Sequence, residues 1–262
     1  MPIFPILLRT SFLPLFFGFL SATLFAQKPA VLDTLNFNVK NPTAILVVSI
    51  TEGFYHKEAI PAGKLLLAQL GRQEGFNVLH TNSKLEVVKL DFQQFASVVF
   101  LCTTLDIFNA PTQDRFERYI KNGGGYLGIH AAADTEYKWP WYGQLVGGYF
   151  TSHPPGAPKA TITTLSTTNY FTNHLESQWT IADEWYNYDF KNPQLIPLLN
   201  LEESSYQGGT NGAKHPISWY HYYDGGRSFY TGLGHLEATY KDSRFVALLT
   251  KGLRFTTGQV QP

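Results

Sequence analysis

A run of three glycines, followed by a short apolar segment and a histidine, constrains this chain more than any other feature. Residues 123–135 read GGGYLGIHAAADT, so small residues flank one large polar side chain, His130. The pattern is typical of a strand-to-helix elbow, in which close backbone packing lifts the central side chain into a cleft. Hydrolases place a serine or cysteine nucleophile there. An imidazole binds metals and moves protons near neutral pH, but it is a poor substitute for an acylating thiol.

The first 26 of the 262 residues predict a secretory signal peptide. They carry one charge, Arg9, then an apolar run over 12–20 and small residues up to Ala26, where we expect cleavage. The run is shorter than the roughly 20 residues of a comfortable membrane span, so an uncleaved anchor is the less favoured alternative. We expect a secreted or periplasmic protein with no stable membrane span after cleavage. Residues 27–43 then form a lead-in, and residues 44–257 form a single domain.

Composition excludes several classes of function. Lys plus Arg and Asp plus Glu both number 20, which argues against nucleic acid or an anionic membrane as a partner. The single cysteine, Cys102, excludes an internal disulfide and a cysteine-based metal cluster, and we expect it to be buried. The first predicted strand is followed by Thr-Glu-Gly rather than Gly-x-Gly-x-x-Gly, so neither NAD nor a nucleotide is expected.

Hydrophobic periodicity predicts an α/β fold with a doubly wound, mostly parallel sheet. The first half alternates strands with helices, and we place the strands at 44–50, 76–79, 96–102 and 125–129 and the helices at 58–73 and 111–122. The second half predicts extra antiparallel strands and a closing helix. These strands are expected at 160–165, 178–182 and 195–201, then in a hairpin of 215–222 with 227–233, before a helix at 242–257.

Ligands of open α/β sheets bind beyond the carboxyl ends of the strands. Three loops leave such ends, at 51–57, 102–110 and 130–137, and the loop carrying His235 joins them if the last strand is parallel to its neighbours. Several imidazoles and carboxylates at one edge are costly to bury unless they meet a metal, each other or a polar substrate. We therefore predict that His130 and His235 lie close to one common ion or reactant. His80 and His174 belong to no motif and are expected at the surface.

Six motifs, taken in order, resemble the ThuA-like (trehalose utilisation) family over roughly residues 44–257. They are EGFYH at 52–56, residues 124–135, WPWYG at 139–143, SHP at 152–154, DEWY at 183–186 and TGLGH at 231–235. The resemblance implies a flavodoxin-like variant of the class I glutamine amidotransferase fold. Amidotransferases carry a cysteine at the elbow and a His-x-Glu near the C-terminus. This chain has His130 at the elbow and keeps the second element at 235–237, so glutamine hydrolysis through a thiolate is not expected.

The resemblance implies sugar metabolism, on trehalose-like glucosides or their 3-keto derivatives, with a companion sugar dehydrogenase supplying any oxidation. The expected catalytic groups are His130, His235, Glu184 and Glu52. The expected substrate-binding residues are Asp134, Trp139, Trp141, Tyr186 and Glu237. A divalent metal ion, Zn²⁺ or similar, is expected on His56, His130, His153 and His235.

Two alternatives stay open. The chain could be a non-catalytic carbohydrate-binding or accessory module, in which case Trp139, Trp141 and Tyr186 carry the binding. It could instead be a cysteine hydrolase using Cys102, which is the weaker alternative because no helix N-terminus or adjacent histidine is evident for that thiol. Formation of a product from a sugar would indicate an enzyme, whereas binding without a product would indicate the non-catalytic module.

Overall fold

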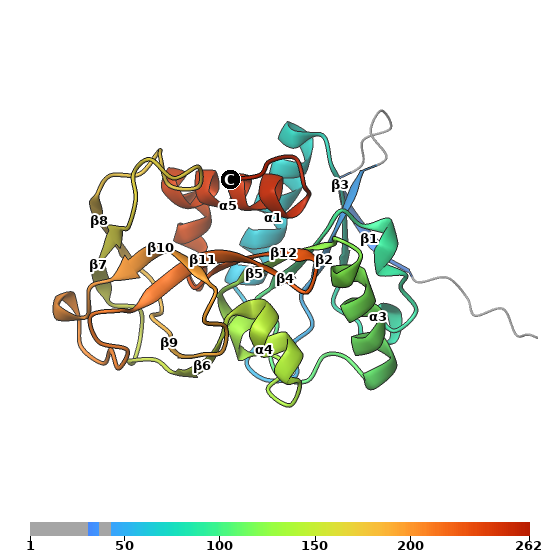
Figure 1. Ribbon diagram of the computed structural model, residues 1–262, viewed down its shortest axis with the longest axis horizontal. Coiled ribbons are helices and arrows are strands. Elements are labelled where there is room, and N and C mark those ends of the chain that lie inside the picture. The colour runs from blue at the N-terminus through green and yellow to red at the C-terminus, as the bar shows by residue number, and fades with distance from the viewer. Residues whose placement is uncertain (1–30, 37–42) are drawn as a thin grey trace, which may run out of the picture.

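A computed structural model describes residues 31–36 and 43–262, and one ten-stranded sheet organises that part of the chain (Figure 1). The strand order is β1-β3-β2-β4-β5-β12-β11-β10-β7-β8. Strands β3, β2, β4, β5 and β12 are mutually parallel, and the other pairings are antiparallel. The bounds are β1 Asp33–Asn36, β2 Ala44–Val48, β3 Asn77–Thr81, β4 Ser97–Leu101, β5 Gly125–Ile129, β7 Lys159–Thr164, β8 Gln178–Ala182, β10 Ile196–Leu201, β11 Pro216–Tyr223 and β12 Gly226–Thr231.

Helices cover both faces of the parallel strands. In Figure 1, α1 and α5 lie on one face, and α3 and α4 lie on the other. A separate two-stranded sheet of β6 and β9 borders α4. The bounds are α1 Ala59–Glu74, α2 Lys84–Val87, α3 Ala110–Lys121, α4 Pro140–Val146, α5 Ser243–Thr256, β6 Gly148–Ser152 and β9 Asn187–Phe190. The predicted doubly wound α/β fold with added antiparallel strands is therefore confirmed.

The turn between β11 and β12 shows how closely local sequence sets this fold. Asp224 and Gly225 form a two-residue connection, with φ of 49° and 92°. Positive φ at both central positions is what a type I′ hairpin turn requires, and Asp-Gly is a favoured pair there. The turn returns the chain along β11 so that β12 pairs in parallel with β5. The loop after β12 thereby reaches the same edge of the sheet as the elbow after β5.

The lead-in contributes a strand that the sequence pattern does not predict. Asp33–Asn36 pairs antiparallel with β3 and covers that edge of the sheet. His80 on β3 is consequently only 1% exposed, and its ring lies 3.1 Å from the Asp33 carboxylate and 2.8 Å from the Ser49 hydroxyl. The expectation that His80 lies at the surface is wrong, because β1 covers it. The expected signal peptide, residues 1–26, lies outside the described residues.

None of the helices in the described part of the chain combines the length and the apolar character that crossing a bilayer requires.

The buried histidine on β11 predicts acid sensitivity of the fold. His221 is 1% exposed, and burial lowers its pKa to about 4. The unfolded chain takes up a proton at this ring near pH 6.5, whereas the folded chain does so only near pH 4, so stability falls as the pH drops through that window. We expect His221→Gln to remove on the order of 2 kcal/mol of this acid-induced loss. Urea unfolding at pH 7 and pH 4.5 measures it, and an unchanged pH dependence contradicts it.

Candidate functional site

The parallel pairing of β5 with β12 brings two distant histidines together. His130 follows β5 directly, and His235 follows β12 by four residues. His130 Nε2 lies 3.3 Å from His235 Nδ1, although 105 residues separate them in sequence. The two rings therefore lie next to each other, while the common ion or reactant expected beside them stays a prediction.

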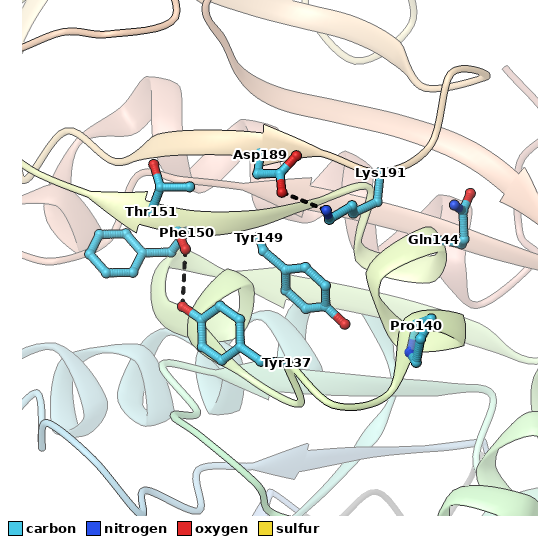
Figure 2. A pocket seen from close by; sticks show the side chains of 8 residues that line it. All are labelled: Tyr137, Pro140, Gln144, Tyr149, Phe150, Thr151, Asp189 and Lys191. Carbon is cyan, nitrogen blue, oxygen red and sulfur yellow. Dashed lines mark hydrogen bonds and ion pairs between the residues drawn. The ribbon is translucent and has the colours of Figure 1, made fainter.

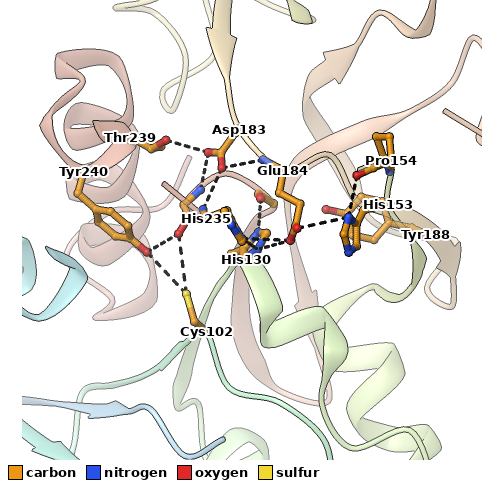
Figure 3. A network of polar contacts seen from close by, with 12 residues as sticks. Cys102, His130, His153, Pro154, Asp183, Glu184, Tyr188, His235, Thr239 and Tyr240 are labelled. Atoms are coloured by element: carbon orange, nitrogen blue, oxygen red, sulfur yellow. Dashed lines mark hydrogen bonds and ion pairs between the residues drawn. The ribbon is translucent and has the colours of Figure 1, made fainter. Parts of the chain in front are cut away.

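Two further side chains complete a four-residue cluster, which we call the His/Glu cluster: His56, His130, Glu184 and His235. One ligand atom of each lies within 4.8 Å of the others. Glu184 Oε2 is 3.3 Å from His130 Nε2 and 3.1 Å from His235 Nδ1 (Figure 3). The second Glu184 oxygen, Oε1, lies 3.3 Å from Nδ1 of His153, whose side chain is 38% exposed. His153 therefore contacts the cluster from its solvent side.

The elbow holds His130 in a defined orientation and protonation pattern. Its φ is 52°, a left-handed conformation that non-glycine residues adopt at a cost and that gathers at functional sites. Nδ1 lies 2.9 Å from the Gly232 carbonyl, which only accepts, so Nδ1 carries the proton and donates. In the neutral ring, Nε2 then presents its lone pair to the cluster. The Tyr186 ring packs on the imidazole, with centroids 4.3 Å apart.

His56 sits at the back of the cluster with an unsatisfied nitrogen. Its side chain packs edge-on against the rings of His130 and His235, with centroids 4.9 and 5.3 Å away. The residue is 4% exposed, and its Nδ1 has no hydrogen-bond partner among the described residues. Burial, followed by the two neighbouring imidazoles, lowers its pKa to about 3, so the ring is neutral. A buried nitrogen without a partner is uncommon in folded proteins and calls for an explanation, which a ligand on this ring would supply.

The carboxylate of Glu184 is the negative group of the cluster. Burial alone would raise its pKa, but the adjacent imidazoles of His130 and His235 outweigh burial and leave the pKa below its usual value. The same contact with Glu184 raises the pKa of His235. Glu184 thus stabilises the protonated form of His235, and the two form an ion pair when that ring carries a proton.

A cavity of about 230 Å³ opens beside the cluster, and we call it the first cavity. A second carboxylate, Asp134, lies on its wall, and burial raises the pKa of Asp134 although the Tyr137 hydroxyl donates to it at 2.6 Å. Two nearby carboxylates with pKa values moved in opposite directions are a recurring arrangement for proton transfer. The lining residues are Phe54, His56, Asp134, Phe150, His153, Glu184 and Tyr186.

Asp183 positions the cluster, a role that the sequence motifs do not predict. It is fully buried and accepts four hydrogen bonds. Oδ1 accepts from the backbone N–H of Glu184 and of His235, both at 2.9 Å. Oδ2 accepts from Gly234 N–H at 2.8 Å and from the Thr239 hydroxyl at 2.9 Å. One carboxylate therefore joins the loop after β8 to the loop after β12, as Figure 3 shows.

Replacing Asp183 with asparagine is expected to weaken this connection between the two loops. An amide nitrogen would face two donors, leaving them unsatisfied at a cost of about 2–4 kcal/mol of unfolding free energy. Displacement of His235 and Glu184 should also weaken any metal affinity by about 10–100-fold, as loss of an outer-shell partner commonly does. Urea unfolding and zinc titration measure the two effects. Unchanged zinc affinity would show that Asp183 does not position the cluster.

Four of the expected site residues belong neither to the His/Glu cluster nor to the lining of the first cavity. Glu52 is half exposed and pairs with Lys84 at 3.3 Å, and the exposed Glu237 pairs with Lys241 one helical turn away. The indole of Trp139 is buried and donates to Glu117 on α3, and that of Trp141 donates to Asp224. The two indoles stack on each other, with centroids 5.1 Å apart. The expected roles of Glu52, Trp139, Trp141 and Glu237 therefore find no support in the lining of the cavity.

Cys102 does not provide a nucleophile. The residue is fully buried behind the cluster, and burial raises the pKa of its thiol to about 12. Its sulfur lies 3.9 Å from the Gly234 carbonyl and 3.7 Å from the Tyr240 hydroxyl. A thiol that keeps its proton at neutral pH is inert, so the cysteine-hydrolase alternative is not supported.

The donor set of the cluster fits a divalent metal. Three imidazoles and one carboxylate are ligands that Zn²⁺ accepts, and Zn–N bonds of roughly 2.0–2.1 Å set the donor atoms of a tetrahedron about 3.3–3.4 Å apart. The three contacts among His130, Glu184 and His235 measure 3.1–3.3 Å. The proton of His130 on Nδ1, donated to a carbonyl, is the usual outer-shell arrangement of a ligating histidine.

Comparison with known proteins identifies the family. A family model described as "ThuA: Trehalose utilisation" matches residues 44–256. The chain belongs to the ThuA family. A ThuA-like protein from Bacteroides uniformis superposes with a TM-score of 0.70 and 22% identity, covering 84% of this chain and 94% of that one. Another, from Parabacteroides merdae, gives 0.70 and 19% identity over 85% and 93% of the two chains.

More distant matches show only what fold this ThuA protein has. A glutamine amidotransferase from Thermotoga maritima superposes with a TM-score of 0.51 and 10% identity, covering 83% of this chain and 99% of that one. The predicted amidotransferase-like fold is thereby confirmed. A β-galactosidase from Rahnella sp. R3 gives 0.55 and 11% identity, over 81% of this chain and 31% of that one. No protein with a curated description matches the sequence significantly.

Proposed function

We propose that this ThuA protein is a carbohydrate-active enzyme that binds a divalent metal in the His/Glu cluster and acts on trehalose-like glucosides or their 3-keto derivatives. The observation that carries the proposal is the convergence of His56, His130, Glu184 and His235, because two of these residues, His56 and Glu184, line a cavity that also holds Asp134. At about 230 Å³, the first cavity is below the roughly 300–1,000 Å³ of sites for drug-sized ligands, which suits one sugar ring.

The His/Glu cluster and Asp134 have separate roles in the proposed reaction. A bound ion would polarise a substrate carbonyl as a Lewis acid. Asp134, outside the donor set, is the group we assign to proton transfer. In a 3-keto-glycoside the hydrogen on C2 lies next to the carbonyl, so Asp134 takes that proton, the C1–O bond breaks, and the electron pair leaves with the aglycone oxygen. That oxygen takes up a proton from solvent or from the half-exposed His153.

Residues 51–53, after the predicted strand at 44–50, read Thr-Glu-Gly rather than Gly-x-Gly-x-x-Gly, which supports a separate enzyme for oxidation of the sugar. We infer that a companion sugar dehydrogenase supplies the keto-sugar. The predicted signal peptide supports a secreted or periplasmic setting for both steps.

Turnover of a small sugar panel tests the proposal. Mature protein loaded with Zn²⁺ is incubated with trehalose, methyl α-D-glucopyranoside and their 3-keto forms, and products are identified by NMR. We expect aglycone release from a keto form, reduced about 10²–10⁴-fold in Asp134→Asn. Asp106→Asn is the matched control, because that carboxylate pairs with Lys138 at the surface. Sugar-induced stabilisation without any product would instead assign the cleft to a non-catalytic binding module.

A further inference from the structure

A second cavity, of about 410 Å³, adjoins the first, and no step above uses it. The two share Phe150 as a wall: the Phe150 ring packs on Tyr186 of the first cavity, with centroids 4.2 Å apart. Tyr137 lies at the same boundary. Its hydroxyl is 2.6 Å from Asp134 Oδ1 and 3.1 Å from the Phe150 carbonyl, and its ring lines the second cavity (Figure 2).

The walls of the second cavity combine aromatic faces with paired polar groups. Tyr137 and Tyr149 lie side by side, with centroids 5.1 Å apart and planes 31° from parallel. Asp189 and Lys191 form an ion pair at the rim, and the Lys191 ammonium is 6.0 Å from the Tyr149 centroid. Gln144 faces the same space, so acceptors and donors stand around an aromatic floor (Figure 2).

This chemistry suits a neutral polyhydroxylated ring. The charges of Asp189 and Lys191 compensate each other, so the cavity favours neither an anion nor a cation. A hydroxyl group can both donate and accept a hydrogen bond. It can therefore donate to the carboxylate at the rim, accept from the ammonium, and do either with the amide. An apolar surface with a few placed polar groups is the usual makeup of a small-molecule site.

We propose that the second cavity is a subsite for the leaving-group sugar, so that a disaccharide spans Phe150 with one ring in each cavity. The proposal rests on the proposed function, because it places the reacting ring beside Asp134. It assigns specificity to Tyr137, Gln144, Asp189 and Lys191. The preferred substrate class is therefore a disaccharide rather than a simple alkyl glucoside.

Calorimetric titration with trehalose and with methyl α-D-glucopyranoside tests the subsite. We expect the wild-type protein to bind the disaccharide about tenfold more tightly or better. Gln144→Trp, which fills the second cavity, should abolish this preference and leave methyl glucoside binding unchanged. The double variant Asp189→Ala/Lys191→Ala, at the exposed rim, should have the same effect. It keeps the test valid if Gln144→Trp fails to fold. Lys138→Ala is the matched surface control, since Lys138 pairs with Asp106 at the surface.

The outcomes separate this subsite from the proposed function. Equal wild-type affinities, a preference that survives in both cavity variants, or no binding of either sugar overturns the subsite. If the preference is absent but methyl glucoside in its keto form is turned over, the subsite fails and the enzyme assignment stands. If the preference depends on the second cavity but no sugar is ever turned over, the subsite stands and the enzyme assignment fails.

Discussion

Zinc at 100 times its dissociation constant should stabilise the wild-type protein by about 2.7 kcal/mol, and His130→Asn should abolish that gain. For a chain of this size the stabilisation corresponds to a rise of about 5–10 °C in melting temperature. Asparagine tolerates the left-handed backbone at this elbow, where φ is 52°, so the variant removes the Nε2 ligand while keeping the turn. The loss of affinity should exceed the roughly 10–100-fold that removal of an outer-shell partner costs.

His174→Asn is the matched control for this prediction. That ring lies outside the cluster, with Nε2 3.1 Å from the Arg244 carbonyl. It should respond to zinc as the wild-type protein does. Scanning calorimetry with and without zinc measures all three proteins. An equal zinc response in His130→Asn and the wild-type protein would exclude His130 as a ligand.

Gly125→Ala is expected to be among the most destabilising single substitutions in the fold. A Cβ at this position would lie 1.8 Å from the backbone oxygen of Thr256, the last residue of α5. Backbone cannot rotate aside as a flexible side chain does, so α5 must shift from β5. We expect a loss of about 3 kcal/mol or more of unfolding free energy, the upper range for overpacking. Urea unfolding measures it.

Gly123→Ala, two residues earlier in the same glycine run, is the control. A Cβ there meets nothing within 4 Å, and its φ of 89° leaves only the left-handed strain of a non-glycine residue. That strain costs about 1–2 kcal/mol. A loss in Gly123→Ala equal to or larger than that in Gly125→Ala would show that contact with α5 does not determine the requirement for Gly125.

The proximity of His130 and His235 could be predicted from the sequence because parallel strands end at a common edge of the sheet. The elbow pattern around His130 and the strand before His235 required only that β5 and β12 be parallel neighbours, which they are. Glu184 follows β8 at the far edge of the sheet, so strand order alone could not place it at the cluster. The hydrogen bonds of Asp183 bring it there, and two adjacent acids directly after the predicted strand at 178–182 were the signal available in the sequence.

The spacing of the aromatic residues explains why Trp139 lies in the core and not in the lining of the first cavity. Trp139, Tyr142 and Val146 recur at helical intervals and are all buried on or beside α4. This periodicity favours packing against the sheet and α3 over an open sugar platform. Strand β1 could not be predicted, because Asp33–Asn36 lacks alternation and pairs only through the tertiary edge that β3 offers.

The most direct test of the proposed metal site is an anomalous difference map from crystals grown with Zn²⁺, collected on both sides of the zinc absorption edge. We predict one strong peak bounded by the imidazoles of His56, His130 and His235 and the carboxylate of Glu184, with bonds of about 2.0–2.2 Å. A map without a peak there, or with zinc bound only to other side chains, would contradict it.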